Sequence, residues 1–508
     1  MHEIMNLKRE RKRQLVNHRF YDWVRSDSVP LEERLLFAPI MAIFVMNFRD
    51  ANKWFIRFPK PRNQFEEIIN GNTFEDETHS RLFLEDWRKL HLDEKLEWRA
   101  SDMLWWLFLA EDTEPFRRFV MEFARMTVVD DGDPFIRFAH SEAGEACGNA
   151  FFDTVSKIAT ELERKSGIKY RYFGTYHLSR EPGHVLQSPG IFENQRLDSR
   201  QRPKAMALAT KMFDIFVEMH DCFLHYAESY VGHRAIPRRQ RSAPVWNATP
   251  EVAGVATGHE VERAGPMVPY HADIRRVFLD RKERTAEHPF YAWLREASSV
   301  SPKQKLQRFI PMWIGDIMGY RDLNKYAIRY PAVRSGQEAV INEWCDDLET
   351  HNSLFLNDWD ELKMDQVLGW TASDTLKFCF LDPQMDVHRR NMCTFVKLAM
   401  GHEKPALRFW LLEALEASGH AFFENTKRLA LEVEREAGVR LDYLGDRHDV
   451  AHPVRKGRTG ARALITSEPI TPADRDTAIG MVETIFDAVD EQLSLSLEVG
   501  QSNKFDVR

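Results

Sequence analysis

The sequence lacks three features, each of which would place the chain in a recognisable class of proteins. Its five cysteines are odd in number and form no CxxC pair, which argues against a disulfide framework or a zinc–thiolate site. No uninterrupted apolar run reaches the length of about 18 residues that a membrane-spanning helix needs. The basic stretch 1–16 also lacks the apolar run of a signal peptide. These absences predict a cytoplasmic protein without a membrane partner.

Strand-like alternation of apolar and polar residues is nearly absent, and glycine and proline are sparse outside residues 232–286. Instead, apolar residues recur every three to four positions, as they do over residues 31–48, 103–128, 150–165 and 205–230. This pattern predicts an all-α fold made of helical bundles. The net charge of −8 gives no chain-wide basic footprint, so nucleic acid is not an expected partner.

The chain contains an internal duplication with an offset of about 271 residues. FYDWVR at Phe20 returns as FYAWLR at Phe290, and THSRLFLEDW at Thr78 returns as THNSLFLNDW at Thr350. Further pairs follow in the same order, including WRASD and WTASD, GEACGNAFF and LEASGHAFF, and YFGTYH and YLGDRH. The order and the nearly constant offset indicate a tandem duplication of one domain.

We therefore predict two domains, at residues 1–231 and 287–508, joined by a linker at residues 232–286. The linker is rich in proline, glycine, alanine and charge, and we expect it to have little structure of its own. It contains a basic run at residues 238–241, which could bind an anionic partner. A solvated linker is the simpler interpretation of this run.

Candidate metal ligands occur on three predicted helices of the first copy. His79 follows Asp76 by three residues and Glu75 by four, so either carboxylate can share its helical face. A second helix carries Glu145, with Glu142 one turn earlier as the alternative. A third segment, 172–184, reads YFGTYHLSREPGH and contains an H-x3-E-x2-H triplet, whose members are His177, Glu181 and His184. Mixed carboxylate and imidazole ligands suit iron or manganese.

On these motifs the chain resembles the heme-oxygenase-like dimetal oxidase family, which is also structurally related to the TenA-type thiaminases. In that family three core helices supply a Glu and a His, then a Glu, then an H-x3-D-x2-H triplet. The resemblance implies two tandem heme-oxygenase-like bundles that form an intramolecular pseudo-dimer, so that the chain can be a monomer. When the family's ligand pattern is carried over position by position, the resemblance implies a metal site whose ligands are Asp76, His79, Glu145, His177, Glu181 and His184.

The sequence departs from the family pattern at three places in the first copy. Glu181 stands where the family has aspartate. Asn72 occupies the position at which the family often has its first carboxylate ligand. Asp76 or Glu75 would have to supply that carboxylate instead, and if neither does, the second metal ion would be lost. Pro182 lies inside the triplet and disfavours a regular helix there.

The second copy keeps only part of this ligand set. Leu348 replaces Asp76, and Arg455 replaces His184, where a cation would repel a metal. We therefore expect the second copy to be a non-catalytic partner of the first. The residues that could form a vestigial or mononuclear site in it are His351, Glu416, His448 and His452.

The resemblance implies a non-heme oxidoreductase that uses Fe(II), with two ions in the first copy and manganese as the alternative metal. O2 would be the co-substrate, a small organic molecule the substrate, and an external electron donor a further partner. Two other hypotheses stay open at this stage. One is a TenA-like hydrolase with Cys147 as nucleophile, and the other is a non-catalytic helical binding module.

Overall fold

The computed structural model describes residues 1–178, 190–232, 236–239, 268–348, 351–445 and 458–507. Within these ranges the fold is all-α, as predicted, and the only extended pairing is an isolated bridge between Arg99 and Thr371. No helix in the described part of the chain is both long and apolar enough to cross a membrane. The chain divides into two compact units, which comprise residues 1–239 with 370–382, and residues 240–369 with 383–508.

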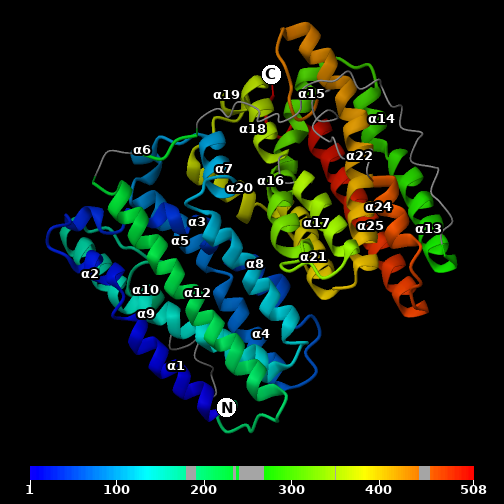
Figure 1. Ribbon diagram of the computed structural model, residues 1–508. Coiled ribbons are helices and arrows are strands. Elements are labelled where there is room, and N and C mark those ends of the chain that lie inside the picture. The colour runs from blue at the N-terminus through cyan, green and yellow to red at the C-terminus, as the bar shows by residue number, and fades with distance from the viewer. Residues whose placement is uncertain (179–189, 233–235, 240–267, 349–350, 446–457, 508) are drawn as a thin grey trace. The chain divides into compact units, whose positions relative to one another are not determined.

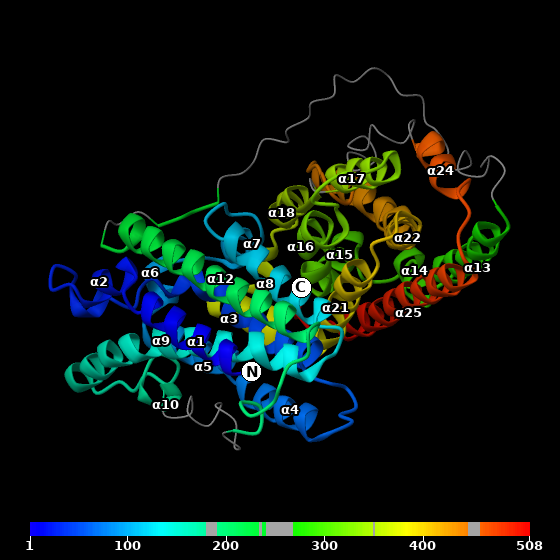
Figure 2. The ribbon, with the colours of Figure 1, turned by 60° about the horizontal axis from the view of Figure 1, so that its bottom comes forward.

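The first unit is built around two long helices. These are α9 (Pro134–Ser166) and α12 (Gln201–Tyr230), which pack along one another and run side by side in both ribbon views (Figures 1 and 2). The remaining elements of this unit are α1 (His2–Leu15), α2 (Arg19–Arg25), η1 (Leu31–Glu33), α3 (Ala38–Asp50), η2 (Ala51–Ile56), α4 (Gln64–Asp76), α5 (His79–Lys89), α6 (Leu92–Leu96), α7 (Ala100–Phe108), α8 (Glu114–Val129), α10 (Thr175–Leu178) and α20 (Ala372–Leu381).

Local sequence explains where helix α9 begins and ends. The Asp133 side chain accepts hydrogen bonds from the backbone N–H groups of Phe135 and Ile136, and Pro134 occupies the first helical position. Gly167 ends the helix with a left-handed φ of 75°. The helix is therefore fixed at both ends, and it carries Glu142, which is buried, and Glu145, which is half-buried.

The second unit repeats this plan with α22 (Pro405–Ala437) and α25 (Pro472–Ser502) as its long helices. Its other elements are α13 (Pro269–Ala286), α14 (Pro289–Arg295), α15 (Pro302–Phe309), η4 (Ile310–Trp313), α16 (Ile314–Asp322), η5 (Leu323–Ile328), α17 (Gly336–Leu348), α18 (His351–Glu361), α19 (Met364–Leu368), η6 (Pro383–Met385), α21 (Asp386–Gly401) and α24 (Arg458–Thr466).

Two features differ from the sequence-based division of the chain. Residues 269–286 fall within the expected linker but form helix α13, which precedes the FYAWLR helix just as α1 precedes the FYDWVR helix. Helix α20 belongs by sequence to the second copy, yet it packs in the first unit against α5 and α7. There the Ser373 backbone N–H donates to Asp93 Oδ1 at 2.9 Å, and Arg88 Nε donates to Ser373 Oγ at 3.2 Å.

The duplicated RDxNKxxIRxP motif forms the same backbone feature twice. In each unit the helix that ends at its aspartate continues into a π-helical turn, η2 or η5. The Asn52 and Asn324 side chains donate to the carbonyls of Phe48 and Tyr320 at 3.0 and 2.9 Å. This network turns the chain at the end of α3 and α16, which indicates a structural function for the motif.

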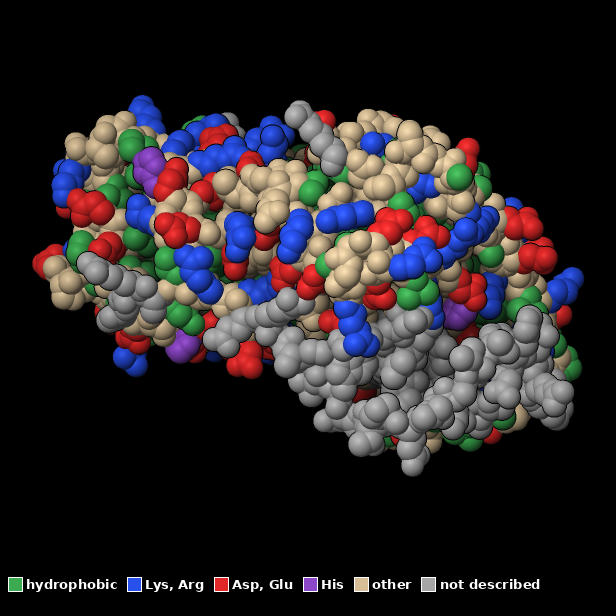
Figure 3. All heavy atoms as spheres, turned by 90° about the horizontal axis from the view of Figure 1, so that it is seen from above, with side chains coloured by type: hydrophobic (Ala, Val, Ile, Leu, Met, Phe, Trp, Pro, Cys, Tyr) green, Lys and Arg blue, Asp and Glu red, His purple; other side chains and the backbone are tan. Residues whose placement is uncertain are grey.

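Basic and acidic side chains are interspersed on the molecular face shown in Figure 3, and hydrophobic side chains appear there in small separate areas. This arrangement agrees with the mixed charge of the whole sequence, which holds 70 Lys and Arg against 78 Asp and Glu.

Candidate functional site

The junction between α4 and α5 places two of the predicted ligands at the interior of the first unit. Asp76 is the last residue of α4 and His79 is the first of α5, and both are buried. Asp76 Oδ1 lies 3.9 Å from His79 Nε2. Glu75 is exposed, so of the two alternative carboxylates Asp76 is the one that faces the interior.

His177 meets His79 from the short helix α10. Its ring is 1% exposed, and its Nε2 lies 2.9 Å from His79 Nε2. Its Nδ1 lies 3.0 Å from the carbonyl oxygen of Tyr172. Because a carbonyl can only accept, Nδ1 must carry a proton, and in the neutral ring Nε2 then presents its lone pair toward His79.

Glu145 and Glu142 lie one turn apart on α9 and have different surroundings. Both residues line the same internal cavity as Asp76, His79 and His177. The Glu142 carboxylate, however, forms an ion pair with the ammonium group of Lys8, from α1. Glu142 is therefore held by a cation of the protein itself.

Asp86 fixes the segment that carries His177 to the helix that carries His79. It is fully buried on α5 and accepts hydrogen bonds from the backbone N–H groups of Arg171, Tyr172 and Phe173 at 2.9, 2.7 and 3.0 Å. Burial raises the pKa of this carboxyl group, although the three N–H donors and Lys89 act in the opposite direction. Because Asp86 binds both elements together, it sets the position of one candidate ligand relative to the other.

Gly174 completes the turn that leads into α10. A Cβ at this position would lie 2.1 Å from the carbonyl oxygen of Tyr170, so no other residue fits without moving the backbone. The sequence suggested neither Asp86 nor Gly174 as important for the site, although both belong to repeated motifs, LEDW with LNDW and YFG with YLG.

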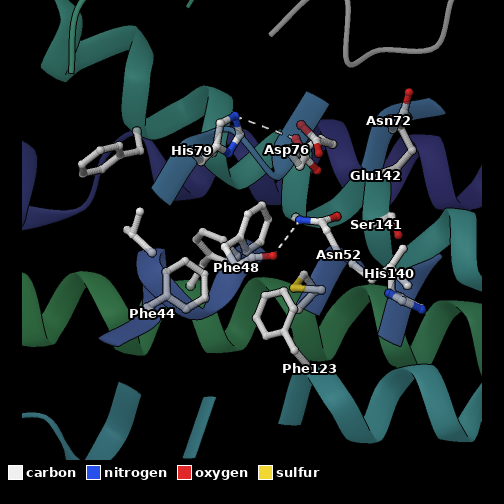
Figure 4. Close-up of a pocket in the computed structure, with 18 of the residues that line it drawn as sticks. Phe44, Phe48, Asn52, Asn72, Asp76, His79, Phe123, His140, Ser141 and Glu142 are labelled. Atoms are coloured by element: carbon white, nitrogen blue, oxygen red, sulfur yellow. Dashed lines mark hydrogen bonds and ion pairs between the residues drawn. The ribbon is translucent and has the colours of Figure 1, made fainter. Parts of the chain in front are cut away.

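The cavity that these residues line has a volume of about 110 Å³ and is mostly apolar. Phenylalanine rings lie beside two of the candidate ligands. The ring of Phe48 stacks on that of His79 at a centroid distance of 5.9 Å, and the ring centroids of Phe152 and His177 are 3.9 Å apart. Figure 4 shows His79 on one side of the pocket and His140 and Ser141 on the other, with Phe48 and Phe123 between them.

Of the six residues predicted as metal ligands, the structure brings four to one cavity, namely Asp76, His79, Glu145 and His177. Glu181 and His184 lie outside the described residues, as does Pro182. Within the described ranges, no group of three or more His, Cys, Asp or Glu side chains has an arrangement that could hold a metal ion.

In the second unit, Glu416 lies on α22 and is half-buried. Its charge adds to burial and to the Asp316 charge in raising the pKa of Tyr320, the residue that corresponds to Phe48. His448 and His452 are outside the described part of the chain, and so is the side chain of His351, which begins α18.

Cys147 does not have the surroundings of a nucleophile. It is fully buried, burial raises the pKa of its thiol well above the usual value, and it is absent from the cavity lining. A reactive cysteine needs an accessible thiolate, so the structure does not favour the hydrolase hypothesis.

A comparison with models of known protein families gives no match for this chain. A comparison with curated proteins likewise finds no significant relative.

Proposed function

We propose that the first unit is a non-heme dimetal oxidase or oxygenase of the heme-oxygenase-like type, which uses O2 to oxidise a small organic molecule. The observation that carries this proposal is the convergence of Asp76, His79, Glu145 and His177 on one buried, aromatic-lined cavity. These four residues, with Glu181 and His184, would hold two Fe(II) ions, or manganese as the alternative. The bound metal would supply the O2 chemistry, with electrons from an external donor.

Two of the residues that would hold the metal lie close together, since His79 Nε2 and His177 Nε2 are 2.9 Å apart. Imidazole nitrogen is a suitable ligand for iron, and carboxylate oxygen is suitable for manganese. The four described residues would need Glu181 and His184 to complete the ligand set.

The residues around the candidate ligands have definable tasks. The Tyr172 carbonyl holds the proton on His177 Nδ1 and so keeps Nε2 free of one. Asp86 holds the backbone that carries His177. The rings of Phe48 and Phe152 cover the two histidines and exclude water from the space in which the substrate would react.

The proposed pseudo-dimer gives the second copy a supporting function. Its helix α20 is part of the first unit and packs against α5, the helix that begins with His79. The loss of ligands at Leu348 and Arg455 is compatible with a copy retained for structure.

Elemental analysis tests the proposal directly. Full-length protein produced with iron should contain two iron ions per chain and should consume O2 after anaerobic iron loading. The double variant His177→Ala with His184→Ala should contain almost none. His91→Ala, which changes an exposed histidine of the same unit, is the matched control and should keep its iron. Wild-type protein without stoichiometric metal and without O2 consumption would refute the proposal.

A further inference from the structure

The cavity of the first unit extends beyond the candidate ligands, and its far part has a chemistry of its own. It is lined there by apolar side chains that include Phe44, Phe123, Phe138 and Phe216. The whole cavity has a volume of about 110 Å³. A dry apolar cavity of about 150 Å³ binds benzene, so the volume limits a ligand here to about one aromatic ring.

The charged groups at this end are already compensated inside the protein. Glu142 is paired with Lys8. His140 Nε2 lies 3.2 Å from Asp130 Oδ2, and Asp130 is also paired with Arg137 at 2.8 Å. A charged ligand would therefore meet no counter-ion here, and burying an isolated charge is costly. The site consequently favours an uncharged ligand.

One polar group in this part of the cavity is suited to bind a ligand. The Ser141 hydroxyl oxygen is buried and has no hydrogen-bond partner among the described residues. Two other polar side chains of the lining are engaged with the backbone, since Asn52 Nδ2 donates to the Phe48 carbonyl at 3.0 Å and Thr127 Oγ1 to the Ala124 carbonyl at 2.8 Å. A buried hydroxyl favours a partner that can donate or accept.

From these observations we infer that the cavity binds a neutral, single-ring aromatic molecule with one hydroxyl group, a simple phenol, whose hydroxyl group bonds to Ser141. This inference rests on the proposed function in one respect, because it assigns Asp76, His79, Glu145 and His177 to metal and not to the ligand. The ring would occupy the phenylalanine-lined space between Ser141 and the candidate metal ligands (Figure 4).

The second unit carries a version of this region with other side chains. Trp344 stands at the position of Asn72, is 6% exposed and packs against Phe409 at a ring distance of 6.0 Å. Leu412 stands at the position of Ser141 and is fully buried. The tryptophan and the leucine are larger than asparagine and serine, and leucine has no hydroxyl group, so they indicate which changes should abolish binding in the first unit.

Calorimetric titration of the full-length protein with phenol, toluene and benzoate tests the inference, with and without Mn(II). Phenol should bind, toluene should bind roughly three- to tenfold more weakly because it lacks the hydrogen bond, and benzoate should bind at least about tenfold more weakly than phenol because its charge has no partner. Ser141→Ala should bind phenol and toluene equally. Asn72→Trp, which introduces the second unit's residue, should bind neither.

Ser156→Ala is the matched control, because this buried serine of α9 does not line the cavity and its removal should leave both affinities unchanged. Absence of saturable phenol binding, benzoate binding as tight as phenol, or a Ser141→Ala variant that still prefers phenol would overturn the inference. Phenol binding to a protein that takes up no metal would refute the proposed function alone. Metal uptake without phenol binding would refute only this inference.

Discussion

The two copies of the repeat differ in their interiors much more than in the contacts that shape them. Asp358 accepts hydrogen bonds from the backbone N–H groups of Tyr443 and Leu444, as Asp86 does from Tyr172 and Phe173. The asparagine of the π-helical turn is likewise kept in both units. The second unit has thus retained the framework that would position a ligand-bearing segment.

The cavity positions have changed in the same unit. Asp316 occupies the position that corresponds to Phe44 of the first cavity, and it is buried. It is paired with His388, and Gln492 Nε2 donates a hydrogen bond to its Oδ1 at 2.8 Å. Trp344 and Leu412 replace Asn72 and Ser141. The hydrogen-bond network shared by both units is therefore scaffold, whereas the residues confined to the first unit are the candidates for function.

The strongest test of this contrast removes the same glutamate from each copy. Glu145→Ala should reduce the iron content and O2 consumption of the protein to background, because it removes a carboxylate ligand. Glu416→Ala should leave both unchanged. Elemental analysis and an oxygen electrode measure the two effects. A loss of about half the metal in each variant would show instead that both copies bind it equally.

A second test separates scaffold from site at the buried aspartates. Asp86→Ala removes the acceptor of three backbone N–H groups and should lower the free energy of unfolding by about 3 kcal/mol. It should also weaken metal binding by about 10- to 100-fold, because the His177 segment loses its anchor. Urea denaturation and metal titration measure these effects.

Asp358→Ala is the matched variant in the second unit. It should destabilise the protein to a similar degree but leave metal affinity unchanged. Equal metal affinity in Asp86→Ala and wild type would mean that Asp86 does not position His177.

A third test concerns helix α20. Leu376 is fully buried on this helix, and its counterpart Leu104 is fully buried on α7. Leu376→Ala should cost about 2–5 kcal/mol. Because α20 packs in the first unit, hydrogen exchange should accelerate in α5, almost 300 residues earlier in the sequence. Faster exchange restricted to the second unit would contradict the assignment of α20 to the first.

Much of the fold follows from local patterns in the sequence. The spacing of apolar residues predicted helices because each helix buries one face, and the structure confirms the all-α class. The membership of α20 in the first unit could not be predicted, because it depends on long-range packing. Helix α13 was missed because its charged, weakly amphipathic sequence adjoins a stretch rich in proline and glycine.

The candidate site was predicted in part. Ligand types and helical spacing led to Asp76, His79, Glu145 and His177, which line one cavity. Asp86 was missed because a buried carboxylate that bonds only to backbone leaves no motif of partner side chains. Ser141 was missed because a single serine in a helix carries no signal without the cavity around it.

The smallest expected effect lies in the acid stability of the first unit. Burial raises the pKa of Asp130, but hydrogen bonds from His140 and Arg137 outweigh this, and the folded-state pKa is below the usual value. The unfolded chain then binds more protons than the folded one, so this stabilisation is present above the unfolded pKa of about 3.9 and is lost as the pH falls through the folded value. In the second copy Gly401 occupies the position of Asp130, so the second unit lacks this pH-dependent stabilisation.

Asp130→Asn should therefore flatten the dependence of stability on pH below about pH 4 without changing its slope at neutral pH. Urea denaturation at a series of pH values, followed for the full-length protein, measures this slope. Asp131→Asn is the matched control, because this neighbouring carboxylate is highly exposed and its ion pair with Lys204 is open to solvent. If the two variants had the same acid profile, the loss of stability would come from overall charge and not from the buried network that distinguishes the first unit.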